Sequence, residues 1–503
     1  MKRKMKLTAF FMAIVMVIAL NCGVLAQEVD QAQTEQEQTQ AGLEQTQEVP
    51  AAWASEGVSW SAIYGLVSQD MLANYRADVT RAELYSAACS LYIRLTGKTI
   101  EPKEDDPFAD AGLPVASEAY AIGIIDGGSF EPEEAATRQE MADVIFKVLD
   151  VSGLELDLST AGSNTHDAVQ FFCGNGLLKG RGGNELYLAS PCSRQELMVF
   201  LHRVYEYTAY ETGNYSKGLF WKASDEDSTI YLLGSIHLAD QSLYPLSKDI
   251  LNAFDSSDVL VLEADLSNIE EGTLYMQQKM FYEGDETIDK NIPEGLYEVY
   301  SGLMDQLGVN PDLYNKFKPW YAAMLIQNLA LGNTGEAGAG SADSANTYSS
   351  ALGIDMYFTA KAIGSKEIAE IEGLKFQVDM FDSFSDEIQA WYLASVLLPS
   401  ESSSEDGADV TFADLLSAWE NGDAEVIEKA VKASNSDDPK ATEFNTIFWN
   451  TRNNHMYEKA KEFLADPEGR TYFIVVGAGH MEGDTGIVTQ LARDGYDVER
   501  ILH

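Results

Sequence analysis

Short apolar runs alternate with longer amphipathic stretches in the part of the chain beyond residue 219. The runs are rich in β-branched residues and are bounded by glycine or acidic residues, which predicts buried strands. The strands are expected at 229–233, 259–262, 367–371, 472–476 and 498–502. Apolar residues at helical spacing predict helices at 246–254, 274–331, 377–398, 412–464 and 485–494. This alternation predicts an α/β domain over 219–503 with a mainly parallel or mixed sheet.

A different pattern occurs three times between residues 53 and 210. In each copy a Gly-apolar-apolar element precedes Thr/Ser-Arg-x-Glu, which opens an apolar segment of helical period. The arginines are Arg81, Arg138 and Arg194, at spacings of 138 − 81 = 57 and 194 − 138 = 56. Threonine or serine followed three residues later by glutamate is the capping-box pattern of a helix N-terminus. The fixed period predicts three helical repeats, at about 51–105, 106–160 and 161–210.

The first residues have the features of an export signal. Lys2, Arg3, Lys4 and Lys6 precede the apolar run 7–20, and small residues end the segment at Ala26. We therefore expect residues 1–26 to be a cleaved secretory signal peptide. Residues 27–50 are dominated by Gln, Glu and Thr, which predicts a disordered spacer. No later apolar run reaches the roughly 18 residues of a membrane span.

Charge and cysteine content narrow the classes of function. A formal net charge of −46 argues against nucleic-acid binding, because neutralising phosphates requires clustered lysine and arginine. After signal cleavage the chain keeps Cys89, Cys173 and Cys192. An odd number gives no disulfide framework. A Cys173–Cys192 pair and three small buried side chains are both compatible with this number.

The predicted strands place several chemical groups at their carboxyl ends. His237 and His480 each end a Gly-x-x-His turn after a strand, and Glu263 and Glu372 directly follow two other strands. Carboxyl ends of parallel strands meet at one edge of a sheet. Two imidazoles and a carboxylate suit a divalent metal with an open position, and a second glutamate could move protons. The alternative is that each histidine only stabilises its turn.

The remaining histidines have no such context, and we interpret them as structural or surface residues. They are His166, His202, His455 and His503.

The N-terminal repeats resemble the S-layer homology family. The middle repeat is most similar, with Phe108-Ala-Asp110, Gly123-Ile-Ile125 and Thr137-Arg-Gln-Glu140, whereas the first and third lack parts of the pattern. The resemblance implies an all-α module of pseudo-threefold symmetry that binds pyruvylated secondary cell-wall polysaccharide. It assigns Arg81, Arg138 and Arg194 to that binding, and a guanidinium suits a ketal-linked carboxylate. The alternative is that these arginines pair only with nearby acidic residues.

The C-terminal region resembles the TraB/PrgY/GumN family, which includes the Tiki metalloproteases. The shared motifs are Leu232-Leu-Gly-Ser-Ile-His237, Lys318-Pro-Trp320, Gly353-Ile-Asp355, Ile371-Glu372 with Gln377, Arg452-Asn453 and Val475-Val-Gly-Ala-Gly-His480. The resemblance implies a fold related to the erythromycin-esterase and ChaN-like folds. It also implies an active centre of His237, Glu263 and His480 that binds manganese or cobalt, with zinc left open. Arg452 would contact an oxyanion or a substrate carboxylate, or would form a structural ion pair.

Together these patterns predict an exported protein at the cell surface of a Gram-positive-type bacterium. Its repeats would bind the wall, and its C-terminal domain would hydrolyse peptides with a divalent metal. Two alternatives remain open. One is a non-catalytic protein that sequesters a peptide, and the other is a metal-independent, esterase-like hydrolase with histidine as general base.

Overall fold

The computed structural model describes residues 48–109, 112–159, 167–182, 185–225, 228–265, 267, 270–330, 348–398, 410–433 and 438–502. These residues form two compact units, divided between Tyr215 and Ser216. The expected signal peptide and most of the expected spacer lie outside the described residues. Within the described part of the chain, no helix combines the length and apolar character needed to cross a bilayer.

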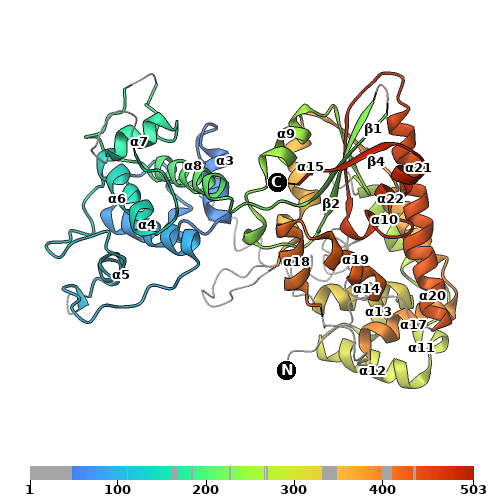
Figure 1. Ribbon diagram of the computed structural model, residues 1–503. Helices are drawn as coiled ribbons and strands as arrows, with labels where there is room; N and C mark the ends of the chain where they lie inside the picture. Colours follow the sequence, from blue (N-terminus) through green and yellow to red (C-terminus); the bar gives the residue numbers. More distant parts are fainter. Residues whose placement is uncertain are drawn as a thin grey trace. The chain divides into compact units, whose positions relative to one another are not determined.

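The unit before residue 216 is built from helices (Figure 1, blue to green). They are α3 (Ser55–Ile63), η2 (Gln69–Met71), α4 (Arg81–Thr96), α5 (Pro114–Ile122), α6 (Arg138–Val151), α7 (Ala168–Gly174) and α8 (Arg194–Thr212). The helices α4, α6 and α8 begin at the repeated arginines, as the sequence pattern predicts. Thr80 and Ser193 form complete capping boxes with Glu83 and Glu196, and Thr137 accepts a hydrogen bond from the backbone of Glu140.

The three segments that lead into α4, α6 and α8 close a ring of backbone hydrogen bonds. The N–H of Val79 donates to the carbonyl of Cys192 over 2.7 Å, Cys192 donates to Ala136 over 2.9 Å, and Ala136 donates to Val79 over 2.8 Å. Each of these residues immediately precedes a helix-capping residue. The repeats therefore contact one another cyclically and not as a linear stack.

A second ring of side chains surrounds the first. Arg81 Nε donates to Glu140 over 2.7 Å, Arg138 Nη1 donates to Glu196 over 2.8 Å, and Arg194 pairs with Glu83. Each acceptor is the glutamate of the Thr/Ser-Arg-x-Glu motif in the next unit around the ring. In the first and third units the carboxylate of Glu83 or Glu196 therefore caps its own helix and also pairs with the arginine of a neighbouring repeat.

The cysteines of this unit are free thiols. Cys89 and Cys192 are buried and Cys173 is partly buried. Burial raises the pKa of Cys89 and of Cys192 to about 12. Of the two possibilities left open by the sequence, the structure shows separate thiols.

The unit after residue 216 contains a six-stranded sheet of order β4-β3-β5-β2-β1-β6. The strands are β1 (Leu219–Ser224), β2 (Thr229–Ser235), β3 (Val259–Leu262), β4 (Glu367–Glu370), β5 (Tyr472–Gly477) and β6 (Asp497–Arg500). Strands β4, β3, β5 and β2 are parallel, and β1 is antiparallel to both β2 and β6. The prediction of a mixed α/β sheet is confirmed. Strand β1 was not predicted, because its short run with a central Lys222 has no clear alternation.

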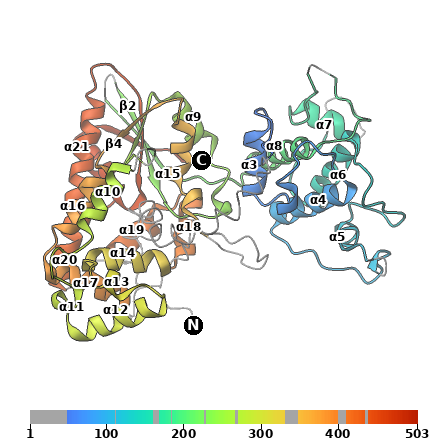
Figure 2. The ribbon, with the colours of Figure 1, turned by 180° about the vertical axis from the view of Figure 1, so that it is seen from behind.

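Helices cover both faces of the sheet and extend beyond it. Around the sheet lie α9 (Lys248–Ser256), α10 (Glu270–Lys279), α15 (Ile354–Ala362), α16 (Gly373–Asp382), α21 (Arg452–Leu464) and α22 (Ile487–Arg493). The extension contains α11 (Ile288–Asn291), α12 (Glu294–Gln306), α13 (Pro311–Tyr314), α14 (Pro319–Ala330), α17 (Asp386–Leu397), α18 (Phe412–Asn421), α19 (Ala424–Ala433) and α20 (Pro439–Asn445). Helices α9 and α15 lie on one side of the sheet and α21 and α22 on the other (Figures 1 and 2).

Aromatic side chains contribute to the core both against the sheet and in the helical extension. Phe254 of α9 and Phe358 of α15 pack against Phe473 of β5, with ring centroids 5.5 and 4.9 Å from it. In the extension, Phe444 and Phe448 continue a cluster with Phe381 of α16. These contacts hold α16 and the segment that leads into α21 in place. Both segments carry residues that lie near the predicted site at the carboxyl ends of the strands.

The Arg–Glu ring gives a stability prediction. Burial raises the pKa of Glu196, but hydrogen bonds from Arg181 and Ser193 and the charge of Arg138 outweigh burial and lower it to about 2. Glu196→Gln should therefore lower the free energy of unfolding of this unit by about 2 kcal/mol at pH 7. Because the carboxylate contributes above its usual pKa of 4.5, the difference should shrink as pH falls from there towards 2.

Calorimetric unfolding of the full chain at pH 7 and pH 3 measures this difference. The exposed Glu133→Gln is the matched control and should leave the transition unchanged. An equal loss of stability at both pH values would contradict the assignment of the effect to the Glu196 charge.

Candidate functional site

The two Gly-x-x-His turns lie side by side because β2 and β5 are parallel neighbours in register. Gly234 pairs with Val476 and Ser235 with Gly477. The turns approach so closely that a Cβ on Gly234 would lie 3.0 Å from the Cα of Ala478. A Cβ on Gly477 would lie 3.1 Å from Glu263 Oε1. A larger residue at either position would therefore be crowded where the backbones and the carboxylate meet.

Glu263 follows β3, the neighbour of β5 on its other side. Its Oε1 accepts the backbone N–H of Gly477 over 2.6 Å. Its Oε2 accepts Arg452 Nη2 over 2.7 Å and Gln377 Nε2 over 3.3 Å. The residue is only 4% exposed, and these donors fix its orientation beside the Gly477 turn.

Arg452 holds Glu263 and Glu372 together. Its Nε and Nη2 donate to the two oxygens of Glu372 over 2.9 and 2.8 Å, and Nη2 also reaches Glu263. Burial lowers the pKa of Arg452, but the two carboxylates outweigh burial and raise it. Arg452 has no exposed surface, and its Nη1 is buried without a hydrogen-bond partner among the described residues. Of the roles considered from the sequence, the geometry shows the ion pair.

His237 contacts a carboxylate that the predicted catalytic set did not include. Its Nδ1 lies 2.6 Å from Oδ2 of Asp355, at the start of α15. A Cβ on Gly353 would lie 2.3 Å from the carbonyl oxygen of His237, so only glycine permits this approach. Burial lowers the pKa of His237, but the charge of Asp355 outweighs burial and raises it. The other ring nitrogen, Nε2, is buried without a hydrogen-bond partner among the described residues.

His480 is oriented by an amide in the same way. Asn453 Nδ2 donates to Thr485 Oγ1 over 3.1 Å, which leaves its Oδ1 to accept the Nδ1–H of His480 over 2.6 Å. Nε2 of His480 then carries a lone pair and lies 4.0 Å from Glu263 Oε1. Burial, together with the charges of Arg452 and His237, lowers the pKa of His480 well below its usual value. The ring is therefore neutral at physiological pH.

The predicted site residues thus converge on one edge of the sheet. A Cβ on Gly477 would be close to Glu263 Oε1, to His480 Cδ2 at 3.4 Å and to His237 Nε2 at 3.9 Å. Glu372 joins this group through Arg452. Asp355 and Asn453 are the contacts that the predicted site set omitted. Both residues belong to motifs that are visible in the sequence, but the sequence does not show which way their side chains point.

The site's donors fit a divalent metal in part. Each imidazole is held at Nδ1 and keeps Nε2 for the site, which is typical of histidines that ligate metals. Glu263, however, already accepts bonds from Gly477, Arg452 and Gln377. No three His, Cys, Asp or Glu side chains in the described part of the chain are grouped so that they could hold a metal ion together.

The remaining described histidines have other contacts. His455 Nε2 lies 3.2 Å from the carbonyl oxygen of Ile371, and its ring stacks on Phe376. His202 lies 3.1 Å from Glu206. His166 and His503 lie outside the described residues.

Comparison with known families agrees with the motifs at this edge of the sheet. The model of the TraB/PrgY/gumN family matches residues 219–500, more than half of the chain. The chain belongs to the TraB/PrgY/gumN family. Two curated relatives are the uncharacterized protein YbaP of Escherichia coli K12 and that of Shigella flexneri, each 25% identical over 134 residues. That alignment covers 26% of this chain and 47% of the relative, so the chain spans about half the length of the curated relatives it matches.

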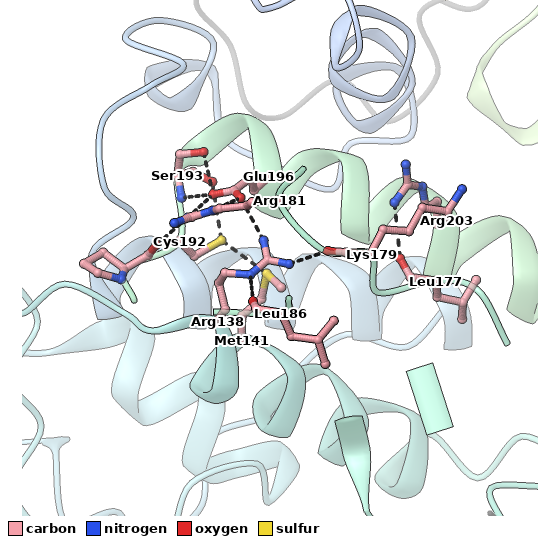
Figure 3. A network of polar contacts seen from close by, with 11 residues as sticks. Arg138, Met141, Leu177, Lys179, Arg181, Leu186, Cys192, Ser193, Glu196 and Arg203 are labelled. Atoms are coloured by element: carbon pink, nitrogen blue, oxygen red, sulfur yellow. Dashed lines mark hydrogen bonds and ion pairs between the residues drawn. The ribbon is translucent and has the colours of Figure 1, made fainter. Parts of the chain in front are cut away.

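The N-terminal unit has a separate, basic cavity of about 490 Å³. Arg138, Lys179, Arg181 and Arg203 line it, together with Trp53. Figure 3 shows that Arg138 and Arg181 both point to Glu196, whereas Arg203 lies apart and donates to the carbonyl of Leu177 over 3.3 Å. The assignment of Arg81, Arg138 and Arg194 to polysaccharide binding stays a prediction, and all three are engaged with glutamates.

The His237–Asp355 contact gives a prediction about proton affinity. Asp355→Asn removes the charge that raises the pKa of His237, so this pKa should fall below its usual value, as burial alone dictates. The loss of stability should be largest below about pH 6.5, where the wild-type pair is fully formed. It should disappear as pH rises through the raised pKa.

Titration of the His237 ring by NMR, with His455 as internal reference, measures this shift. The exposed Asp379→Asn is the control variant. An unchanged His237 titration in Asp355→Asn would show that Asp355 does not set its proton affinity.

Proposed function

We propose that the TraB/PrgY/gumN domain hydrolyses peptide bonds at the edge of the sheet where His237, Glu263 and His480 converge. The observation that carries this proposal is the matched pair of imidazoles. His237 presents Nε2 towards Gly477, and Nε2 of His480 lies 4.0 Å from Glu263 Oε1. Each ring is held at Nδ1, that of His237 by Asp355 and that of His480 by Asn453. Such an arrangement holds two nitrogen donors ready for a metal or a reacting group, with little reorganisation.

In this proposal His237, His480 and Glu263 would hold a divalent metal, manganese or cobalt by family resemblance and zinc as a further candidate. Such a metal would supply Lewis acidity to the reacting carbonyl and to water. The depressed pKa of His480 keeps its ring neutral, as a ligand must be. Arg452 and Glu372 are positioning residues. They form a buried ion pair with each other, and Arg452 also holds the carboxylate of Glu263 in place.

The His237–Asp355 pair favours a second candidate, hydrolysis without a metal. A histidine whose pKa is raised by a buried carboxylate can accept a proton from water or a hydroxyl group and retain it. Asp355 would then orient His237 and stabilise its protonated form. The non-catalytic alternative is sequestration of a peptide at the cell surface, with the peptide bound at the same edge of the sheet and not cleaved.

Metal content and turnover, measured on the same samples, separate these candidates. The purified full chain should bind about one equivalent of Mn²⁺, Co²⁺ or Zn²⁺ and cleave members of a mixed peptide library. His480→Ala should lower turnover by about 100-fold or more and reduce the bound metal. His455→Ala, a histidine outside the site, is the matched control.

Each alternative has a distinct outcome in this experiment. Cleavage that persists in excess chelator while Asp355→Asn abolishes it supports the metal-independent hydrolase. Saturable peptide binding without cleavage, retained in His237→Ala, supports sequestration. Unchanged turnover in His480→Ala together with no bound metal would sink the metallopeptidase proposal.

We further propose that the N-terminal unit attaches the protein to pyruvylated wall polysaccharide, in line with its resemblance to S-layer homology repeats. The basic cavity supports this, since it concentrates cations in a chain of net charge −46. Guanidinium groups match carboxylates such as those of pyruvate ketals. Arg203 is the best candidate contact, because its long bond to Leu177 is weaker than the short ion pairs of Arg138 and Arg181.

The anchoring proposal predicts that Lys179→Gln combined with Arg203→Gln lowers retention on purified wall sacculi by about tenfold. These substitutions leave the Arg–Glu ring intact, so a circular-dichroism spectrum should remain that of the wild type. The exposed Lys98→Gln is the control. Equal retention of the double variant, or of the wild type on sacculi stripped of polysaccharide, would contradict anchoring through this cavity.

A further inference from the structure

A cavity of about 430 Å³ in the C-terminal unit borders the turn that carries His480. Its volume lies within the range of pockets that hold small ligands. Trp221 and Trp449 supply aromatic surface, and Ile427 of α19 adds an apolar wall. Asn453 and Gly479 also line the cavity, so it shares its wall with the site described above.

A chain of hydrogen bonds links this cavity to His480. The Nδ1–H of His480 donates to Asn453, Asn453 donates to Thr485, and Thr485 Oγ1 donates to Asn450 Oδ1 over 3.1 Å. Asn450, Asn453 and Thr485 all line the cavity. The ring of Trp449 lies 5.0 Å from the ring of His480, centroid to centroid. An occupant of the cavity therefore touches the groups that orient His480.

The charged residues of the cavity are mostly acidic. Glu428, Glu482 and Asp484 line it, against a single lysine, Lys432, which pairs with Glu428 over 2.6 Å. Glu482 is partly buried, and Arg500 Nη1 lies 3.9 Å from its Oε1, beyond hydrogen-bond length. A further cation beside Glu482 would be stabilised.

We propose that this cavity is the substrate subsite for a lysine or arginine side chain of the peptide. The aliphatic stem packs against Trp449 and Ile427, and the cationic end reaches Glu482 and Asp484. Long cationic side chains bind in this way, with an apolar stem on aromatic surface and a charged end near solvent. The inference rests on the proposed peptide hydrolysis and adds its sequence preference. It also gives a reason for the hydrogen-bonded chain of Asn450, Thr485 and Asn453. Through this chain the bound side chain would contact the turn that carries His480.

The test uses the full chain and pools of acetylated, amidated hexapeptides in which one position holds Arg, citrulline or Glu. Citrulline keeps the shape of arginine and removes its charge. Wild type should cleave the Arg pool fastest and the Glu pool slowest. Glu482→Gln should lower cleavage of the Arg pool by roughly three- to fivefold, as expected for a partly exposed pair, and leave the citrulline pool unchanged.

Two further variants secure the interpretation. Asp484→Asn lies at the exposed side of the cavity and should act in the same direction without affecting folding. Glu458→Gln removes an exposed carboxylate outside the cavity and should change neither pool. Equal cleavage of the Arg and citrulline pools by wild type, or an equal effect of Glu458→Gln, overturns the proposal.

Binding is measured separately from turnover, by equilibrium dialysis of the same pools against His237→Ala. If no pool is cleaved but the Arg pool binds best and Glu482→Gln removes that preference, the subsite stands and the proposed hydrolysis falls. If peptides are cleaved without any preference for Arg in rate or binding, hydrolysis stands and the subsite falls.

Discussion

A single buried ion network, Arg452 with Glu263 and Glu372, determines the geometry of the C-terminal site. An arginine without exposed surface is stable only with its carboxylates in place, and loss of one partner of such a pair costs roughly 3–5 kcal/mol. The network joins the ends of β3 and β4 to α21. It also orients Glu263 so that its second oxygen accepts the N–H of Gly477. The position of Glu263 beside the two histidine turns therefore depends on its ion pair with Arg452.

The sequence contains enough information for the strands and for the edge where the site forms. Parallel strands with β-branched runs and Gly-x-x-His endings specify which residues meet, because register and strand direction place His237, Glu263 and His480 together. The partners of those histidines depend on side-chain directions across elements far apart in sequence. Asp355 begins a helix and Asn453 follows the arginine in α21, so their contacts emerge only when helices and sheet pack. The antiparallel strand β1 was not predicted for a simpler reason, since Lys222 interrupts its apolar run and leaves no clear alternation.

The arginines of the N-terminal repeats show a related limit of prediction from sequence. Their spacing correctly places three helix starts, but spacing alone gives no information on what the guanidinium groups contact. The carboxylates of Glu83 and Glu196 cap their own helices and also accept a hydrogen bond from the arginine of a neighbouring repeat. One residue type thus serves both local helix formation and contact between repeats, which explains why the pattern of Thr/Ser-Arg-x-Glu recurs as a unit.

The cyclic hydrogen bonds among Val79, Ala136 and Cys192 have a topological consequence. A linear repeat protein has two ends, and it can gain or lose a repeat while its other interfaces persist. A closed ring has no ends, so each repeat fills two interfaces and the loss of any one opens both. The number of repeats in this unit is therefore fixed by closure. Evolution can vary the loops and cavities around the ring, but it cannot lengthen or shorten the ring one repeat at a time.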